Sequence, residues 1–461
     1  MFVGLPTLER AMLRLRSVVR PAPFAARSAH RLHRSARAAA GIASGLLAWN
    51  GWPIGVAAQT PPTPVRGAHA IATARLTAPS PYLLVWAGPN GASTGGNDFI
   101  AVLDANPASR TYGKVLASRD VGVAGAMAPH IELTLPAGHA LFASDYMTGR
   151  IFLLDVADPL RPHLVTRIDS VPGFRRPHSF ARLPNGNVVT SMQFGNRSVA
   201  GDPGGLAEFD AVGRLLRTSS AADPAFPGAR IRPNGVELLP AIDRIVTTSM
   251  PMDDERTADV VQIWRLSDLH LLKTMAVPQV AGDSTGNFPY DTRALADGRT
   301  AMLDTYYCGL YRISRLDTSA PRIELVHTLR VPRAEGCAVA VVVGRYWVVP
   351  VAYGRVIVSL DVTDPAHPVE VSRLRTDSTF LPHWISTDRA SDRLVINSAD
   401  DGDARVLIAR LDRRTGQLSW DARFRDAGST RPGVSFDRRQ WPHGSASHTM
   451  AHSALFGPAV R

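Results

Sequence analysis

A strand–turn–strand unit recurs along this chain of 461 residues, and it constrains the fold more than any other feature. Each copy contains a short apolar strand, a tight turn and a second apolar strand, and two further strands follow it. The six copies read PHIELTLPAGHALFASD from Pro129, PHSFARLPNGNVVTSM from Pro177, PNGVELLPAIDRIVTTS from Pro233, PYDTRALADGRTAMLDT from Pro289, GCAVAVVVGRYWVVPV from Gly336 and PHWISTDRASDRLVINS from Pro382. They start roughly 50 residues apart, which is the spacing of four-stranded propeller blades. The repeat therefore predicts an all-β protein of the β-propeller class.

The two ends of the repeat region supply one further blade. Residues 81–121 match only strands two to four of a unit, and MAHSALFG at residues 450–457 resembles a lone innermost strand. Joining them completes a seventh blade and removes the exposed edges of an open ring. We therefore predict a seven-bladed β-propeller over residues 81–461, closed by pairing the N-terminal strands with the C-terminal strand. Six or eight blades are the alternatives.

The first 58 residues carry most of the net charge of +11, because they hold eight arginines and a single acid, Glu9. An apolar run that closes on small residues up to Ala58 follows these arginines, in the order typical of a secretory signal peptide. We expect a signal peptide over residues 1–58, a Pro/Thr/Ala-rich linker over residues 59–80 and a periplasmic or secreted mature protein. A membrane anchor and an Arg-rich transit peptide are the alternatives. The mature chain shows no other apolar run long enough to span a bilayer and no basic stripe for nucleic acid.

One position of the repeat, the residue after the proline, gathers polar side chains. The innermost strand of a blade lines the central channel, so this position should face one mouth of the channel in every blade. Four of the twelve histidines that follow residue 58 occupy it. The seven residues at this position are His130, His178, Asn234, Tyr290, Cys337, His383 and His452.

Neutral imidazoles around one axis suit Cu, Zn, Fe or Ni. We therefore predict a transition-metal site whose ligands are His130, His178, His383 and His452. Asp291 and Cys337 are the candidate catalytic residues beside it, and Asn234, Tyr290 and His448 are further candidates at the channel mouth. The alternative is a channel of polar residues bridged by water.

Two other features leave alternatives open. Cys308 and Cys337 lie on the same predicted face, so they either form a disulfide in an oxidising compartment or leave Cys337 as a thiolate beside the histidines. Arg176 and Arg232 each precede the proline of a repeat. They either attract an anion or are simply solvated.

Several sequence segments resemble those of the selenium-binding protein family, whose bacterial members include methanethiol oxidases. They are RPHSFARLPNGNVVTSM with GDPGGLAEFD, VVQIWRLSDLHLLKTM, PYDTRALADGRTAMLD and the His-containing end of the chain. The resemblance covers about residues 80–456 as a loose blade pattern, and it implies a seven-bladed propeller with a histidine-built copper site that oxidises a small thiol. Phe180 or Ala181 replaces a second histidine of the family's pattern, and the family's Cys-rich motif is missing.

The residues and the resemblance together predict an exported, copper-dependent oxidoreductase acting on a small substrate such as a thiol. A lactonase-like hydrolase is a second hypothesis, in which Asn234 and Asp291 hold a hard cation. A non-catalytic scaffold that binds a partner on the propeller face is the third.

Overall fold

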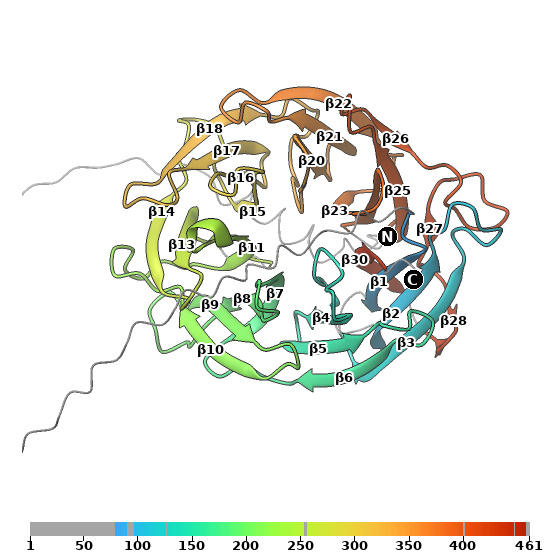
Figure 1. Cartoon of the computed structure of the whole chain (residues 1–461). Coiled ribbons are helices and arrows are strands. Elements are labelled where there is room, and N and C mark those ends of the chain that lie inside the picture. The colour runs from blue at the N-terminus through green and yellow to red at the C-terminus, as the bar shows by residue number, and fades with distance from the viewer. Residues whose placement is uncertain are drawn as a thin grey trace, which may run out of the picture. The chain divides into compact units, whose positions relative to one another are not determined.

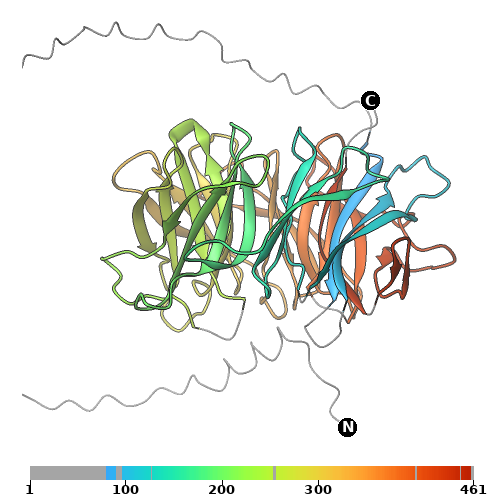
Figure 2. The same cartoon turned by 90° about the horizontal axis from the view of Figure 1, so that it is seen from below.

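The computed structural model describes residues 79–457, apart from residues 90–95, 126, 253–255, 400–401 and 447. The expected signal peptide and nearly all of the expected linker lie outside these residues. In the described part, antiparallel sheets stand side by side around a central axis, with one edge of each toward the axis (Figure 1). Figure 2 shows the same arrangement turned by 90°. The all-β, seven-bladed prediction is confirmed.

We number the blades from 1 to 7 along the chain. Blade 1 contains β1 (Tyr82–Pro89), β2 (Asn97–Asp104), β3 (Val115–Ala124) and β30 (Thr449–Phe456). Blade 2 contains β4 (Ala140–Asp145), β5 (Arg150–Asp155) and β6 (His163–Ile168). Blade 3 contains β7 (Arg175–Arg182), β8 (Val188–Phe194), β9 (Pro203–Phe209) and β10 (Leu215–Ser220). Blade 4 contains β11 (Pro233–Leu239), the 3-10 turn η1 (Pro240–Ile242), β12 (Arg244–Ser249), β13 (Val260–Arg265) and β14 (Leu271–Ala276).

The remaining blades follow the same plan. Blade 5 contains β15 (Pro289–Ala294), β16 (Ala301–Thr305), β17 (Gly309–Ser314) and β18 (Arg322–Thr328). Blade 6 contains β19 (Val341–Val343), β20 (Tyr346–Val351), β21 (Val356–Asp361) and β22 (Val369–Arg375). Blade 7 contains β23 (Pro382–Thr387), β24 (Arg393–Ser398), β25 (Arg405–Leu411), β26 (Leu418–Trp420) and β27 (Val434–Ser435). A small hairpin of β28 (Gln440–Trp441) and β29 (Gly444–Ser445) precedes β30.

The burial of the strands follows their place in the blade. In blade 3, every residue of β8 and β9 is buried, whereas residues of the outer strand β10 alternate between exposed and half-buried. The middle strands are covered on both faces by the neighbouring blades, so their apolar runs are nearly continuous. Only the outermost strand has a solvent face, which explains its alternating pattern.

The innermost strands are irregular where the sequence places the polar position. The register of pairing with the second strand shifts beside His178, Asn234, Tyr290, His383 and His452. These shifts are β-bulges, each of which leaves a residue outside the regular ladder. In blades 2 and 6 the expected innermost strands at Pro129 and Gly336 are reduced to isolated bridges and the three residues of β19.

The first and last strands of the propeller pair with each other. β30 pairs antiparallel with β1, from Leu83 opposite Phe456 to Pro89 opposite Thr449. A buried network ties blade 7 to the start of blade 1 near this point. Arg393 forms an ion pair with Asp388 at 2.6 Å and donates to the carbonyl oxygen of Ser80 at 2.7 Å.

The described part of the chain contains no helix with the length and apolarity needed to cross a lipid bilayer.

Candidate functional site

Three of the predicted metal ligands meet in the channel. His452, His130 and His383 come from blades 1, 2 and 7, which are neighbours in the ring. Each offers one ring nitrogen, and these three atoms all lie within 4.8 Å of one another. Because a zinc–imidazole bond is about 2 Å long, two ligand nitrogens on one such ion lie at most about 4 Å apart. The three rings are therefore close to a metal-binding arrangement and need only a small inward movement to complete it.

The fourth predicted ligand, His178 of blade 3, packs against this group. Its ring centroid is 4.0 Å from that of His130, and the centroids of His383 and His452 are 4.7 Å apart. None of the four side chains belongs to a residue more than 4% exposed. The structure thus brings all four predicted histidines into one buried cluster, although His178 is not within the 4.8 Å set.

Ser179 determines which nitrogens of two imidazoles face the cluster. Its hydroxyl oxygen lies 3.1 Å from Nδ1 of His178 and 3.4 Å from Nδ1 of His130. This leaves Nε2 of both rings for another partner, and the two nitrogens have none among the described residues. Both ring nitrogens of His452 are likewise buried without a hydrogen-bond partner in the described part of the chain.

These buried nitrogens fit a bound metal ion. An unsatisfied buried polar group costs about 1–3 kcal/mol, so a cluster of four such atoms at one place is costly unless a ligand occupies it. A transition metal ion satisfies imidazole nitrogens through their lone pairs, provided that the rings are neutral.

Burial keeps the imidazoles neutral. It lowers the pKa of His178 to about 3 and that of His383 to about 4. Burial is also the main reason why the pKa values of His130 and His452 lie well below the ordinary value, and the positive charge that neighbouring histidines would carry lowers them further. All four rings therefore keep a lone pair at neutral pH, which metal binding requires.

The other half of the channel contains Asn234 and Tyr290, both of which the structure places beside the cluster. The side-chain Oδ1 of Asn234 accepts from Nε2 of Gln193 at 2.8 Å, and its Nδ2 donates to the carbonyl oxygen of Tyr290 at 2.8 Å. The hydroxyl of Tyr290 lies 3.4 Å from Nε2 of His383. Asn234 thus connects three blades, whereas Tyr290 contacts a histidine of the cluster directly.

Asp291 is held by Arg293, a residue that the sequence analysis missed. Oδ1 of Asp291 accepts from Arg293 Nη1 at 2.7 Å, and Oδ2 lies 2.6 Å from Nη2. Asp304 accepts the backbone N–H of Asp291 at 3.0 Å, and burial raises the pKa of both carboxyl groups. The i, i+2 spacing of Asp291 and Arg293 on one strand is a signal that would have identified this pair.

A small cavity lies beside the cluster. Its volume is about 20 Å³, which is enough for about one water-sized molecule. His130, Tyr290, Asp291 and Trp384 are among the residues that line it. The Trp384 ring packs 5.0 Å from that of His130, and its Nε1 donates to the carbonyl oxygen of Ala454 at 2.7 Å. Trp384, like Ser179, was not recognised in the sequence because its role depends on contacts between blades.

Two predicted site residues have other positions than expected. Cys337 forms a disulfide with Cys308, with Cα atoms 5.2 Å apart, so it has no free thiolate. The hypothesis of a catalytic Cys337 thiol is therefore wrong. Of the two alternatives given for the cysteines, the disulfide is the one that the structure contains. His448 is exposed, and its Nδ1 lies 2.9 Å from a carboxylate oxygen of Asp437. It does not join the buried histidines.

The fold and the site together define a seven-bladed β-propeller with a buried histidine cluster in its channel. No family model matches the chain. It is similar to a methanethiol oxidase from Hyphomicrobium sp, with 26% identity over 225 residues, a match that covers 45% of this chain and 50% of that protein. The match thus spans about half the length of that relative.

Solved structures show the same architecture. A hypothetical selenium-binding protein from Sulfolobus tokodaii has a TM-score of 0.65 at 12% identity and covers 82% of this chain and 93% of its own. A periplasmic gluconolactonase from Pseudomonas aeruginosa has a TM-score of 0.55 at 16% identity, and the match covers 80% of this chain and 98% of the gluconolactonase chain. At these identities the structural likeness concerns the fold alone. Together, the similarities fit a remote relationship to selenium-binding protein and methanethiol oxidase-like propellers.

Proposed function

We propose that this protein is a metal-dependent oxidoreductase of the periplasm or the extracellular space. His130, His178, His383 and His452 hold a transition metal ion, copper by preference, and the substrate is a small molecule such as a thiol. The observation that carries the proposal is the group of buried, neutral imidazoles whose ring nitrogens lack partners in the described residues. The similarity to a methanethiol oxidase supports the redox class, and the Cys308–Cys337 disulfide supports an oxidising compartment.

The chain's own residues prepare the site for such an ion. A bound copper ion would supply one-electron chemistry with a soft sulfur ligand. Ser179 turns the Nε2 atoms of His130 and His178 toward the cluster, and Tyr290 contacts His383. Trp384 covers His130 and excludes water from one side. The low exposure of the histidines keeps protons from competing with a metal for their lone pairs.

Elemental analysis of the purified full chain tests the proposal. After reconstitution with copper and with zinc in parallel, the wild type should retain about one equivalent of a transition metal, and His452→Ala should lose most of it. His448→Ala is the matched control, since this histidine is exposed and lies outside the cluster. The proposal is wrong if the wild type binds no transition metal or if His452→Ala binds as much as the wild type. Thiol-dependent oxygen consumption by the loaded protein then tests the reaction.

The hydrolase hypothesis has less support from the site. A hard cation needs oxygen ligands, yet both ends of the Asn234 amide are hydrogen-bonded within the protein, and Asp291 is paired with Arg293. The gluconolactonase has the same fold, which by itself leaves the chemistry open. Retention of calcium in the same elemental analysis, together with lactone hydrolysis, would favour this hypothesis. Absence of any metal and of turnover would favour a binding scaffold.

A further inference from the structure

Methionines gather at one end of the central channel. Of the ten methionines in the chain, all but Met1 and Met12 fall in the part that the structure describes. Five of these eight lie where innermost strands begin or second strands end, which is also the end at which the residues after the prolines lie. The five are Met127, Met147, Met250, Met252 and Met450. We call this end of the channel the methionine mouth.

A hydrogen-bonded pair, Tyr146 and Gln193, connects methionines of two blades. The hydroxyl of Tyr146 donates to Oε1 of Gln193 at 2.7 Å. The backbone N–H of Tyr146 donates to the carbonyl oxygen of Met127 at 3.0 Å. The side-chain amide of Gln193 donates to the carbonyl oxygen of Met250 at 2.9 Å and accepts from the N–H of Met252 at 3.2 Å. These contacts hold the three methionines around one polar pair.

This group lies between solvent and the histidine cluster. The ring centroid of Tyr146 is 6.2 Å from that of His178. Met147, which follows Tyr146 in the chain, is 51% exposed, whereas Met252 is half-buried and Met250 is buried. The methionines thus range from the surface to the wall of the channel.

Two histidines of the cluster follow a methionine closely in the chain. Met450 lies two residues before His452, and Met127 lies three residues before His130. Both methionines are more exposed than the histidines that they precede. The chain therefore passes from a thioether to an imidazole as it enters the channel in blades 1 and 2.

The distribution around the ring is one-sided. The five methionines belong to blades 1, 2 and 4, and blades 1 to 3 hold three of the four histidines. The corresponding segments of blades 5, 6 and 7, at residues 306–308, 352–355 and 399–404, contain no methionine. A general need for adaptable packing at this end would place methionines around the whole ring. Their concentration near the histidines favours a specific role.

The chemistry of the thioether indicates which ion it binds. Soft sulfur ligands select Cu(I), whereas zinc sites use thiolate, imidazole and carboxylate groups. A thioether carries no proton that must leave, and the unbranched methionine side chain turns easily toward a ligand. The guanidinium of Arg176 lies 5.2 Å from the ring centroid of Tyr146, and its repulsion is twice as large for a divalent ion as for a monovalent one.

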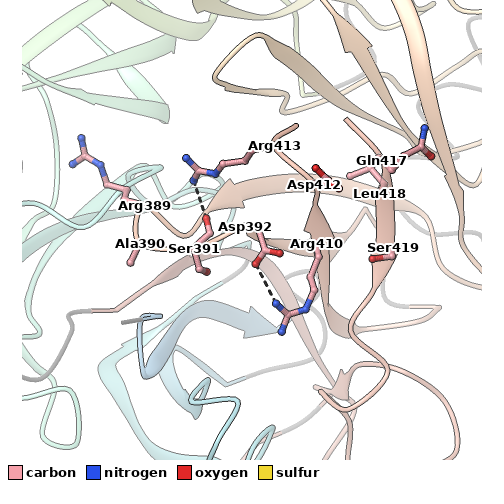
Figure 3. A pocket seen from close by; sticks show the side chains of 10 residues that line it. All are labelled: Arg389, Ala390, Ser391, Asp392, Arg410, Asp412, Arg413, Gln417, Leu418 and Ser419. Carbon is pink, nitrogen blue, oxygen red and sulfur yellow. Dashed lines mark hydrogen bonds and ion pairs between the residues drawn. The ribbon is translucent and has the colours of Figure 1, made fainter. Parts of the chain in front are cut away.

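The open pocket of blade 7 offers a contrast. It has a volume of about 750 Å³ and lies between the β23–β24 and β25–β26 turns (Figure 3). Its arginines are directed at oxygen atoms, since Arg410 lies 3.1 Å from Asp392 and Arg413 donates to the carbonyl oxygen of Ser391 at 2.8 Å. No methionine is among the residues that line it, so it has no soft ligand for Cu(I).

We propose that the methionine mouth is an entry site that binds Cu(I) through thioether sulfurs and passes the ion to the histidine cluster. The proposed ligands are Met127, Met147, Met250 and Met252. The ion is transferred as Cu(I), so the step exchanges no electron. The transfer rests on the proposed function, whereas the capture of Cu(I) by the thioethers does not.

Anaerobic titration of the full chain with Cu(I), in competition with bicinchoninate, tests the capture. His452→Ala should still bind about one equivalent of Cu(I), and X-ray absorption should show sulfur neighbours of the copper. Loss of an outer-shell partner weakens metal affinity about 10–100-fold, so adding Met147→Leu/Met252→Leu, which removes two direct ligands, should weaken binding at least about tenfold. Leucine has a similar volume, and Met275→Leu/Met302→Leu on β14 and β16 is the matched control.

The transfer has a readout of its own. In the chain with all histidines intact, Met147→Leu/Met252→Leu should slow loading with Cu(I) at least about tenfold and leave loading with zinc unchanged, because zinc does not use thioether ligands. An equal delay for zinc would mean a general obstruction of the channel and would overturn the transfer.

The outcomes separate this proposal from that of the histidine site. The entry site is overturned if His452→Ala binds no Cu(I), if the bound copper has no sulfur neighbours, or if Met147→Leu/Met252→Leu binds as tightly as the control. Failure of the histidine site instead appears as equal copper content of the wild type and His452→Ala, with sulfur neighbours in both. Circular dichroism confirms that each variant remains folded.

Discussion

The disulfide offers the sharpest prediction about stability. It joins the β16–β17 turn of blade 5 to the inner segment of blade 6, and the two cysteines are 29 residues apart in sequence. In the chain-entropy account, a cross-link over such a loop restricts the unfolded chain and stabilises the fold by about 3.6 kcal/mol at 25 °C. Both residues are buried in one apolar cluster, so alanine is the suitable replacement. Cys308→Ala/Cys337→Ala should therefore lower the free energy of unfolding by about that amount.

The expected change is measurable in spite of the large size of the protein. Unfolding of about 380 residues has an entropy near 0.8 kcal/mol/K, so the melting temperature should fall by about 4–5 °C. Differential scanning calorimetry of the oxidised wild type and the double variant measures this shift, and the metal content of both should be equal. A shift below about 1 °C would refute the argument from chain entropy.

Three further predictions concern single side chains. Arg393→Met should lower the free energy of unfolding by about 3–5 kcal/mol in denaturant titrations, because it leaves the buried carboxylate of Asp388 without its ion-pair partner. In the control, substitution of the exposed Arg161→Met should change the same free energy by less than about 0.5 kcal/mol. Ser179→Ala should weaken copper affinity about 10–100-fold in competition with a chelator, with little effect on folding. In the metal-free chain, His383 stays neutral down to a pKa of about 4 while the unfolded chain takes up a proton below about 6.5. His383 alone should therefore lower the free energy of unfolding by about 3 kcal/mol between pH 6.5 and 4, in addition to the losses from the other buried histidines. His383→Gln should lose about that much less over the same range, and equal losses in the two chains would contradict the pKa of His383.

The fold could be predicted because its signal is repeated. Each blade needs the same succession of apolar strands, so an ambiguous segment in one blade can be assigned by comparison with the other six. The length of the repeat then identifies the architecture. The irregular inner segments of blades 2 and 6 could not be predicted in this way. Their sequences contain apolar residues, as the other units do, and only the packing of neighbouring blades decides how far the ladder extends.

The histidine cluster was predictable for a related reason. Radial symmetry brings one position of every blade to a common axis, so a column of residues can be identified without knowledge of distances. Ser179, Arg293 and Trp384 were missed because their roles depend on the neighbouring blade or on a side chain two residues away. The state of Cys337 was left open since it depends on the approach of two loops, which the spacing in sequence does not determine.

The β-bulges explain how the residues that follow the prolines can serve a function without destabilising the fold. A bulged residue is outside the regular ladder, so its side chain can be exchanged while the strands on either side keep their backbone hydrogen bonds. His383, for example, lies between Pro382 and Trp384, which pair with consecutive residues of β24. Propellers with the same architecture can therefore differ in the seven residues around their axis. For this protein the column, with its four buried histidines, is stronger evidence of function than the architecture it shares with lactonases.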